Sequence, residues 1–153
     1  MKEKPPPVIR KGFPRTWYYP KWQLLVWFPR GVLNEAFADQ VFAFIEMEER
    51  IQDAPFDRYC DLSGLTGVRA RLEHIFKNAQ RRLKVKQPVR TALFADRPKI
   101  FEVAQIYEHL MDRAMIEVRS FQARAAAAQF LEVPVTALEV PDKVEGISKF
   151  QRE

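Results

Sequence analysis

The chain has 153 residues, of which 47% are hydrophobic and 12% aromatic, and it carries a formal net charge of +5. This length suits one domain with a sizeable core, and the apolar content excludes an intrinsically disordered chain. The charged start with Pro5, Pro6 and Pro7 is unlike a secretory leader, and no apolar run reaches the ~20 residues of a membrane span.

Three segments differ in composition. Residues 1–15 combine prolines with five Lys or Arg and predict a flexible basic arm, because they bury too little apolar surface to offset the entropy of ordering. Residues 16–132 carry the periodic apolar pattern of a folded domain. Residues 133–153, with Pro134 and Pro141, predict an irregular tail along the surface.

The first half of the domain predicts two antiparallel strands, a helix and a third strand. Residues 17–19 and 22–28 are aromatic and β-prone. Apolar residues then recur at helical spacing from Asn34, a good N-cap, to residue 53. Residues 56–62 predict a buried strand that ends at Asp61, in which Cys60, the single cysteine, is a small buried side chain. One cysteine forms no internal disulfide, which favours a reducing cytoplasm.

The second half predicts a helix, a strand, a helix, a strand and a closing helix. A loop at residues 63–67 leads into an amphipathic helix at 68–83. Residues 89–95 read as a buried strand, 98–111 as a helix, 115–121 as a strand, and 122–131 as an Ala-rich helix. The alternation of strands and helices predicts a single α/β domain with a mixed open sheet of about five strands and about four helices. One face of the 68–83 helix is apolar, and its basic face holds Arg71, His74, Lys77, Arg81 and Lys84.

Three motifs carry a family resemblance. Gly31-Val32-Leu33-Asn34 follows the second strand, and Asp61-Leu62-Ser63-Gly64 ends the third. The third motif is a strand, a helix start, a strand and a closing helix: residues 92–95, Asp96-Arg97-Pro98, residues 116–121 and the Ala-rich helix. Together they resemble the STAS family of anti-sigma factor antagonists, with its SpoIIAA-like fold, and within it an uncharacterised bacterial branch grouped with SEC14-like lipid-binding domains.

The resemblance implies a non-enzymatic regulatory or protein-binding module in a bacterial cytoplasm. In the antagonists, a Ser after an acidic residue at the start of the second helix is phosphorylated by a partner kinase. The corresponding stretch here is Thr66-Gly67-Val68-Arg69, which lacks the Asp-Ser pair. Ser63 and Thr66 are the nearest hydroxyls, so the motif does not support a phosphorylation switch.

A ligand or partner site is expected at the carboxyl ends of the strands, where open sheets bind ligands. The residues that this edge should bring together are Arg30 with Asn34, Ser63 with Thr66, and Asp96 with Arg97. The structural alternative for Asn34, Thr66 and Asp96 is helix capping, which is their commoner role.

No catalytic or metal site is predicted, and no cofactor. His74 and His109 lack acidic or Cys residues at metal-ligand spacing, and Ser63 lacks the Gly-x-Ser-x-Gly elbow of hydrolases. The acidic run Glu46, Glu48 and Glu49 is placed mainly on a solvated helix face, with Glu48 at the core boundary.

Two functions compete with the protein-binding module. Aromatic strands and the kinship with SEC14-like domains favour a carrier of a small apolar or lipid-like ligand, which requires a cavity of roughly 300 Å³. The basic arm and second helix suggest weak nucleic-acid binding, although Gly64-Leu65-Thr66-Gly67 is a weak match to the KH-domain loop and basic and aromatic residues are not interleaved. The charge contrast between the first and second helices also suggests a homodimer.

Overall fold

The computed structural model describes residues 5, 7–9 and 13–141. A mixed six-stranded sheet lies at its centre, in the order β1-β2-β3-β5-β7-β8. β2 is antiparallel to both β1 and β3, whereas β3, β5, β7 and β8 run parallel to one another. The strands are β1 (Val8–Ile9), β2 (Thr16–Tyr19), β3 (Leu24–Trp27), β5 (Asp57–Asp61), β7 (Arg90–Phe94) and β8 (Glu117–Phe121).

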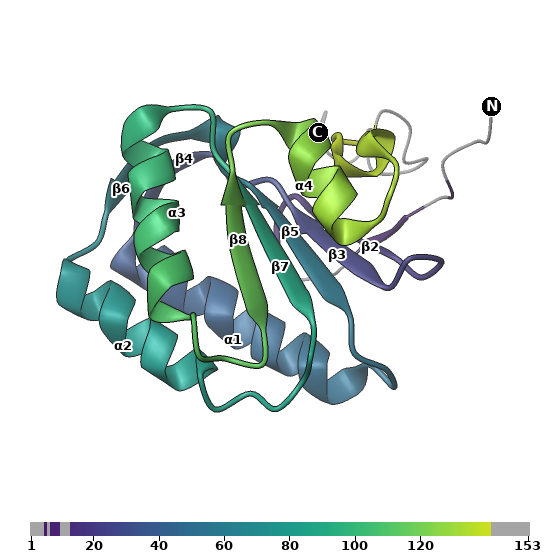
Figure 1. Cartoon of the computed structure of the whole chain (residues 1–153), viewed down its shortest axis with the longest axis horizontal. Coiled ribbons are helices and arrows are strands. Elements are labelled where there is room, and N and C mark those ends of the chain that lie inside the picture. Colours follow the sequence, from purple (N-terminus) through teal and green to yellow (C-terminus); the bar gives the residue numbers. More distant parts are fainter. Residues whose placement is uncertain (1–4, 6, 10–12, 142–153) are drawn as a thin grey trace.

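Helices cover both faces of this sheet. On one face pack α1 (Glu35–Ile51), α2 (Leu72–Arg82) and α3 (Pro98–Leu110), and on the other α4 (Arg124–Leu131) with the short 3-10 helix η2 (Val135–Leu138). Figure 1 shows the sheet between these two groups. The predicted α/β class with four helices and a mixed sheet is confirmed.

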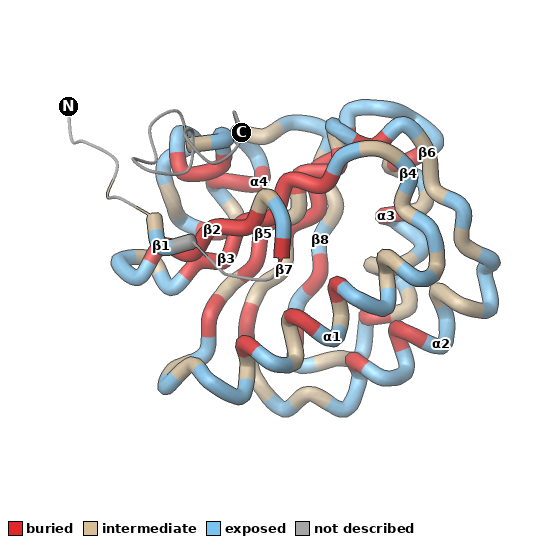
Figure 2. Tube along the Cα trace, turned by 180° about the vertical axis from the view of Figure 1, so that it is seen from behind, coloured by how far each residue is buried: buried red, intermediate tan, exposed pale blue. Residues whose placement is uncertain are grey.

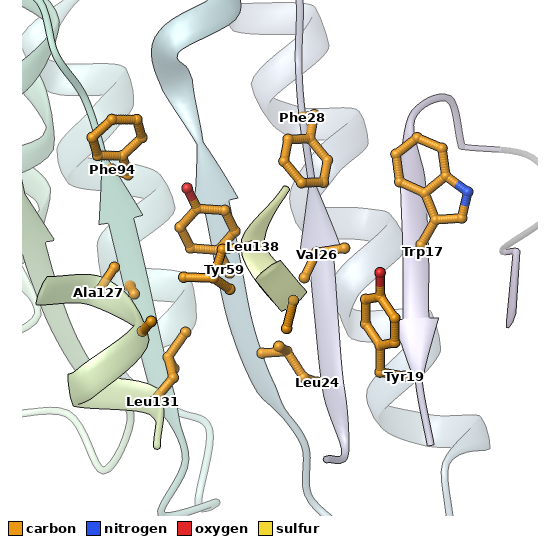
Figure 3. Close-up of a cluster of buried hydrophobic side chains, with 13 residues drawn as sticks. Trp17, Tyr19, Leu24, Val26, Phe28, Tyr59, Phe94, Ala127, Leu131 and Leu138 are labelled. Atoms are coloured by element: carbon orange, nitrogen blue, oxygen red, sulfur yellow. The ribbon is translucent and has the colours of Figure 1, made fainter. Parts of the chain in front are cut away.

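Side chains alternate across the strands and build two core layers. Tyr19, Val26 and Tyr59 are fully buried on the α4 face, where Leu131 and Leu138 pack against them (Figure 3). The opposite face holds Leu25, Trp27, Leu93 and Val118 under α1, α2 and α3. Figure 2 shows that buried residues follow the central strands, whereas the outward sides of α1 and α2 are exposed.

A second, two-stranded parallel sheet pairs β4 (Gly31–Asn34) with β6 (Leu65–Arg69). The predicted loop at 63–67 and helix from residue 68 are therefore wrong, because residues 65–69 are extended and α2 begins at Leu72. Between them, Asp61 caps the short 3-10 helix η1 (Leu62–Gly64). The apolar Leu65 and Val68 fit a strand as well as a helix, so only pairing with β4 decides the conformation.

Helix α2 turns only part of its predicted apolar stripe inward, where Ala79 is buried in the core. Leu72 is 63% exposed and Phe76 48% exposed, whereas Asn78 and Arg82 are buried. The carboxylate of Glu49 in α1 binds Arg82, so an ion pair fixes the rotation of this helix.

The described residues near both ends of the chain pack against the domain. In the segment predicted as a flexible arm, Val8–Ile9 pair with β2, and Phe13 is buried against α1. In the segment predicted as a tail, Ala137 and Leu138 enter the core. Residues 1–4, 6, 10–12 and 142–153 of these two predicted segments lie outside the described residues.

Within the described part of the chain, no helix has both the length and the apolar character required to cross a bilayer.

Candidate functional site

A pocket of about 280 Å³ opens at the carboxyl ends of β3 and β5, on the face covered by α4. We call it the edge pocket. Phe28, Pro29, Gly64 and Val140 contribute to its walls. Its charged and hydroxyl-bearing lining consists of Arg15, Arg30, Asp61, Ser63, Arg124 and Glu139.

Arg15 is held in the pocket by the neighbouring strand. Its Nε donates a hydrogen bond of 2.8 Å to the carbonyl oxygen of Phe28, and its own carbonyl accepts a bond of 3.0 Å from the Phe28 N–H. Its φ of 55° lies in the left-handed region, which is uncommon for a residue with a side chain and often marks a functional site. Burial lowers the pKa of Arg15, and the charge of Arg30 lowers it further.

Arg15 and Arg30 form no ion pair in the part of the chain that the structure describes. Two like charges close enough to perturb one another are less stable together unless an anion lies near both. The pocket therefore contains two cations outside ion-pair distance of any described carboxylate, although the charge of Asp61, which also lines the pocket, partly offsets the lowering of the Arg15 pKa.

Asp61 is the buried hub beneath these cations, with 2% of its surface exposed. It accepts hydrogen bonds from the hydroxyl of Tyr59 at 2.7 Å and from the backbone N–H of Ser63 at 3.1 Å, and a short one from the Ser63 hydroxyl. Arg124 of α4 donates to it at 2.9 Å and neutralises its charge. Asp61 thus orients Arg124, and it accepts the hydrogen bond that the Ser63 hydroxyl donates.

Gly64 allows the β5 turn to pack directly on the segment that carries Arg30. A Cβ at this position would lie 2.7 Å from the carbonyl oxygen of Pro29 and 3.3 Å from Cγ of Arg30. Real Cβ atoms do not approach an oxygen so closely, so a side chain here would displace Pro29 or the turn. Gly64 therefore fixes the position of Arg30 in the pocket.

The structure brings together only part of the predicted site. Arg30 and Ser63 line the edge pocket, whereas Asn34, Thr66, Asp96 and Arg97 do not. Asn34 caps α1 by accepting from the Phe37 N–H at 2.8 Å, as predicted. Thr66 is exposed on β6 and caps no helix. The N-cap of α3 is Arg97 and not Asp96, which precedes it. The Arg97 side chain donates a hydrogen bond of 2.8 Å to the carbonyl of Leu65.

Sequence reasoning missed Arg15 and Arg124 as members of the site. Arg124 could have been noticed in the sequence, because it is the one charged residue in the segment 124–131, which is otherwise rich in alanine. No feature of the sequence marks Arg15. Its role depends on a turn between β1 and β2 that only the sheet order reveals.

The predicted basic face is largely paired within the molecule. Arg71 binds Glu35, Arg81 binds Glu46, and His74 Nε2 lies 2.8 Å from Asp39 Oδ1, all across the α1–α2 contact. Lys77 and Lys84 are exposed. The opposite charges of the two helices, which suggested a homodimer and a nucleic-acid surface, thus mainly pair with each other between α1 and α2.

The acidic run of α1 is also more buried than predicted. Glu48 is 3% exposed, and the side chain of Glu49 is 10% exposed. Glu49 accepts hydrogen bonds from both Arg82 and Arg58. The solvated-face interpretation is wrong for Glu49, because two buried arginines on α2 and β5 bind it, whereas the burial of Glu48 agrees with its predicted place at the core boundary.

Among the described residues, no three His, Cys, Asp or Glu side chains gather as metal ligands. Burial raises the pKa of the Cys60 thiol, and the neighbouring Asp61 charge adds to the effect. A thiol in this environment is a poor nucleophile.

No known protein-family model matches the chain, and no curated protein matches it significantly. Among solved structures, the chain is similar to an uncharacterised protein of the DUF3478 family with a SpoIIAA-like fold from Shewanella loihica PV-4. The identity is 14% and the TM-score 0.48, over 86% of this chain and 98% of that one. SpoIIAA-like is also the fold that the sequence motifs resemble.

Proposed function

We propose that the protein is a non-enzymatic binding module whose edge pocket holds an anionic group of a protein partner, a carboxylate or a phosphate. One observation carries the proposal: Arg15 and Arg30 line a pocket of about 280 Å³ and have no ion-pair partner among the described residues. Guanidinium groups form bidentate hydrogen bonds with both kinds of anion, so the pocket offers suitable donors.

The arrangement is also prepared before binding. Phe28 holds Arg15, the close packing of Gly64 on the Pro29 carbonyl fixes the residue before Arg30, and Asp61 orients Arg124. Fixing donors in advance reduces the entropy lost when a ligand binds. The exposed part of Arg30 leaves the pocket open to an anion from outside.

The same contacts support a binding role more than a catalytic one. The Ser63 hydroxyl donates to Asp61, and Asp61 is bonded to Arg124, so neither group is aligned to activate the other toward a substrate. A turnover that disappears in Ser63→Ala or Asp61→Ala would contradict this part of the proposal.

The test is titration of the protein with inorganic phosphate and with acetate, followed by NMR at low and high ionic strength. We expect saturable shifts in the edge pocket for the unsubstituted chain and a loss of at least ~10-fold in affinity for Arg15→Gln/Arg30→Gln. Lys77→Gln is the matched control, because it removes one exposed cation from α2. Equal weakening by the control, or no saturable binding, would overturn the proposal, whereas shifts confined to α2 would assign the binding to its basic surface.

A further inference from the structure

An apolar cavity of about 150 Å³ lies on the other face of the sheet, between β5 and β7 and the helices α1, α2 and α3. Val41 and Ile45 of α1, Ile75 of α2, Ala104 of α3 and Leu93 of β7 contribute to its lining. This volume is half of the ~300 Å³ at the lower end for drug-sized ligands. It is similar to an engineered protein cavity of about 150 Å³ that binds benzene, so it suits a small molecule and is too small for a membrane lipid.

One wall of this cavity contains hydrogen-bond donors without acceptors. Arg58 of β5 is 4% exposed, and its Nη2 donates to Glu49 at 2.5 Å. Its Nε and Nη1, and the Nε1 of the neighbouring wall residue Trp27, are buried and have no hydrogen-bond partner in the described part of the chain. Buried hydrogen-bond donors are satisfied in the great majority of cases, so three unsatisfied donors in the wall of one cavity suggest that an acceptor binds there.

The aromatic ring beneath Arg58 does not supply that reason. The guanidinium carbon lies 4.4 Å from the centre of the Phe56 ring, which stabilises the charge by a cation–π contact. A ring face accepts no conventional hydrogen bond, so the Arg58 donors still lack an oxygen.

The buried cation Arg58 is only partly compensated. It shares the carboxylate of Glu49 with Arg82, which has a second, longer contact of 3.8 Å with Glu46. Arg58 has no other ion-pair partner among the described residues, and Asp57 adds only a longer-range negative charge. Burial lowers the pKa of Arg58 to about 10, although the charge of Glu49 opposes the shift, which shows how incompletely this cation is compensated.

We infer that this cavity binds a small apolar acid, an aromatic or short-chain carboxylate whose oxygens accept from Arg58 while its hydrocarbon part fills the space between α1, α3 and the sheet. A carboxylate supplies both the missing acceptors and the missing negative charge. The ligand is distinct from the anion of the edge pocket, because the two sites open on opposite faces of the sheet.

The test compares benzoate with benzamide, which has the same shape and no charge. Binding is followed by isothermal titration and by the NMR signal of the Trp27 indole N–H, which lines this cavity and not the edge pocket. We expect the unsubstituted chain to bind benzoate at least ~10-fold more tightly than benzamide, because hydrogen bonds to a charged group discriminate by that order. Arg58→Met should abolish the preference and retain benzamide.

Two variants serve as controls. Ala104→Leu places three more carbons into the cavity and should abolish the Trp27 response to both probes. Arg15→Gln/Arg30→Gln should leave the response unchanged, which separates this inference from the proposed function of the edge pocket. Equal binding of both probes, no Trp27 response, or a preference that survives Arg58→Met would overturn the inference, and the comparison on the unsubstituted chain decides it if Arg58→Met does not fold.

Discussion

The guanidinium of Arg82 in α2 donates two hydrogen bonds to the carboxylate of Glu49 in α1, at 3.0 and 2.6 Å. Glu49 also binds Arg58 on β5, so one carboxylate joins two helices and the sheet. Because both arginines are almost fully buried, removal of this charge leaves Arg58 without its ion-pair partner and Arg82 with only the longer contact of 3.8 Å to Glu46.

Glu49→Gln should therefore lower the free energy of unfolding by about 3 kcal/mol at pH 7, as measured by urea denaturation. Glu73→Gln is the control, because Glu73 is exposed and binds only the exposed Arg71 among the described residues, and it should change stability by less than about 0.5 kcal/mol. Equal effects of the two substitutions would contradict the role of Glu49 in holding the core.

The same carboxylate predicts a pH dependence. Burial alone would raise the pKa of Glu49, but the hydrogen bonds from Arg82 and the charge of Arg58 outweigh it and hold the pKa below its usual value. A folded-state pKa below that of the unfolded chain, about 4.3, contributes stability that is present above that pH. This contribution is lost as the pH falls further, so the stability difference between the unsubstituted chain and Glu49→Gln should shrink in acid.

Gly64→Ala should destabilise the protein by about 1–3 kcal/mol and weaken anion binding, because the new methyl group would overlap the Pro29 carbonyl. Thermal unfolding and the phosphate titration measure the two effects. Gly67→Ala is the matched control, since a Cβ at Gly67 meets nothing within 4 Å. A Gly64→Ala protein as stable as this control would show that the turn does not pack on Pro29.

Arg71→Ala should raise the pKa of Glu35. The side chain and backbone N–H of Arg71 both donate to this carboxylate and hold its pKa at about 2. NMR titration of the Glu35 carboxyl should show a return toward the usual value, whereas Arg81→Ala, which removes the partner of Glu46, should leave Glu35 unchanged. An unshifted Glu35 in Arg71→Ala would place its stabilisation elsewhere.

Cys60 should resist alkylation at neutral pH, because burial raises the pKa of its thiol and leaves little thiolate. Mass spectrometry after treatment with iodoacetamide measures this, with the urea-unfolded chain as the fully labelled control. Rapid labelling of the native protein would contradict a raised thiol pKa, because Cys60 is only partly buried and can be reached without opening of β5.

The α/β class follows from local patterns that the chain carries on its own. The apolar run that became β7 and Pro98 at the start of α3 each determine their element within a few neighbouring residues. The same holds for Asn34, whose side chain caps the helix that immediately follows it. Arg30 and Ser63 could be placed near the carboxyl ends of strands because parallel strands align those ends.

The tertiary structure alone decided which residues meet across the sheet and between helices. Leu65 and Val68 suit a helix or a strand, and pairing with β4 selected the strand. The apolar stripe of α2 predicted Leu72 and Phe76 inside, but they are exposed, and the buried carboxylate of Glu49 holds Arg82 inside instead. The edge pocket and the apolar cavity join residues far apart in sequence, and their formation depends on long-range packing and charge pairing that no local pattern encodes.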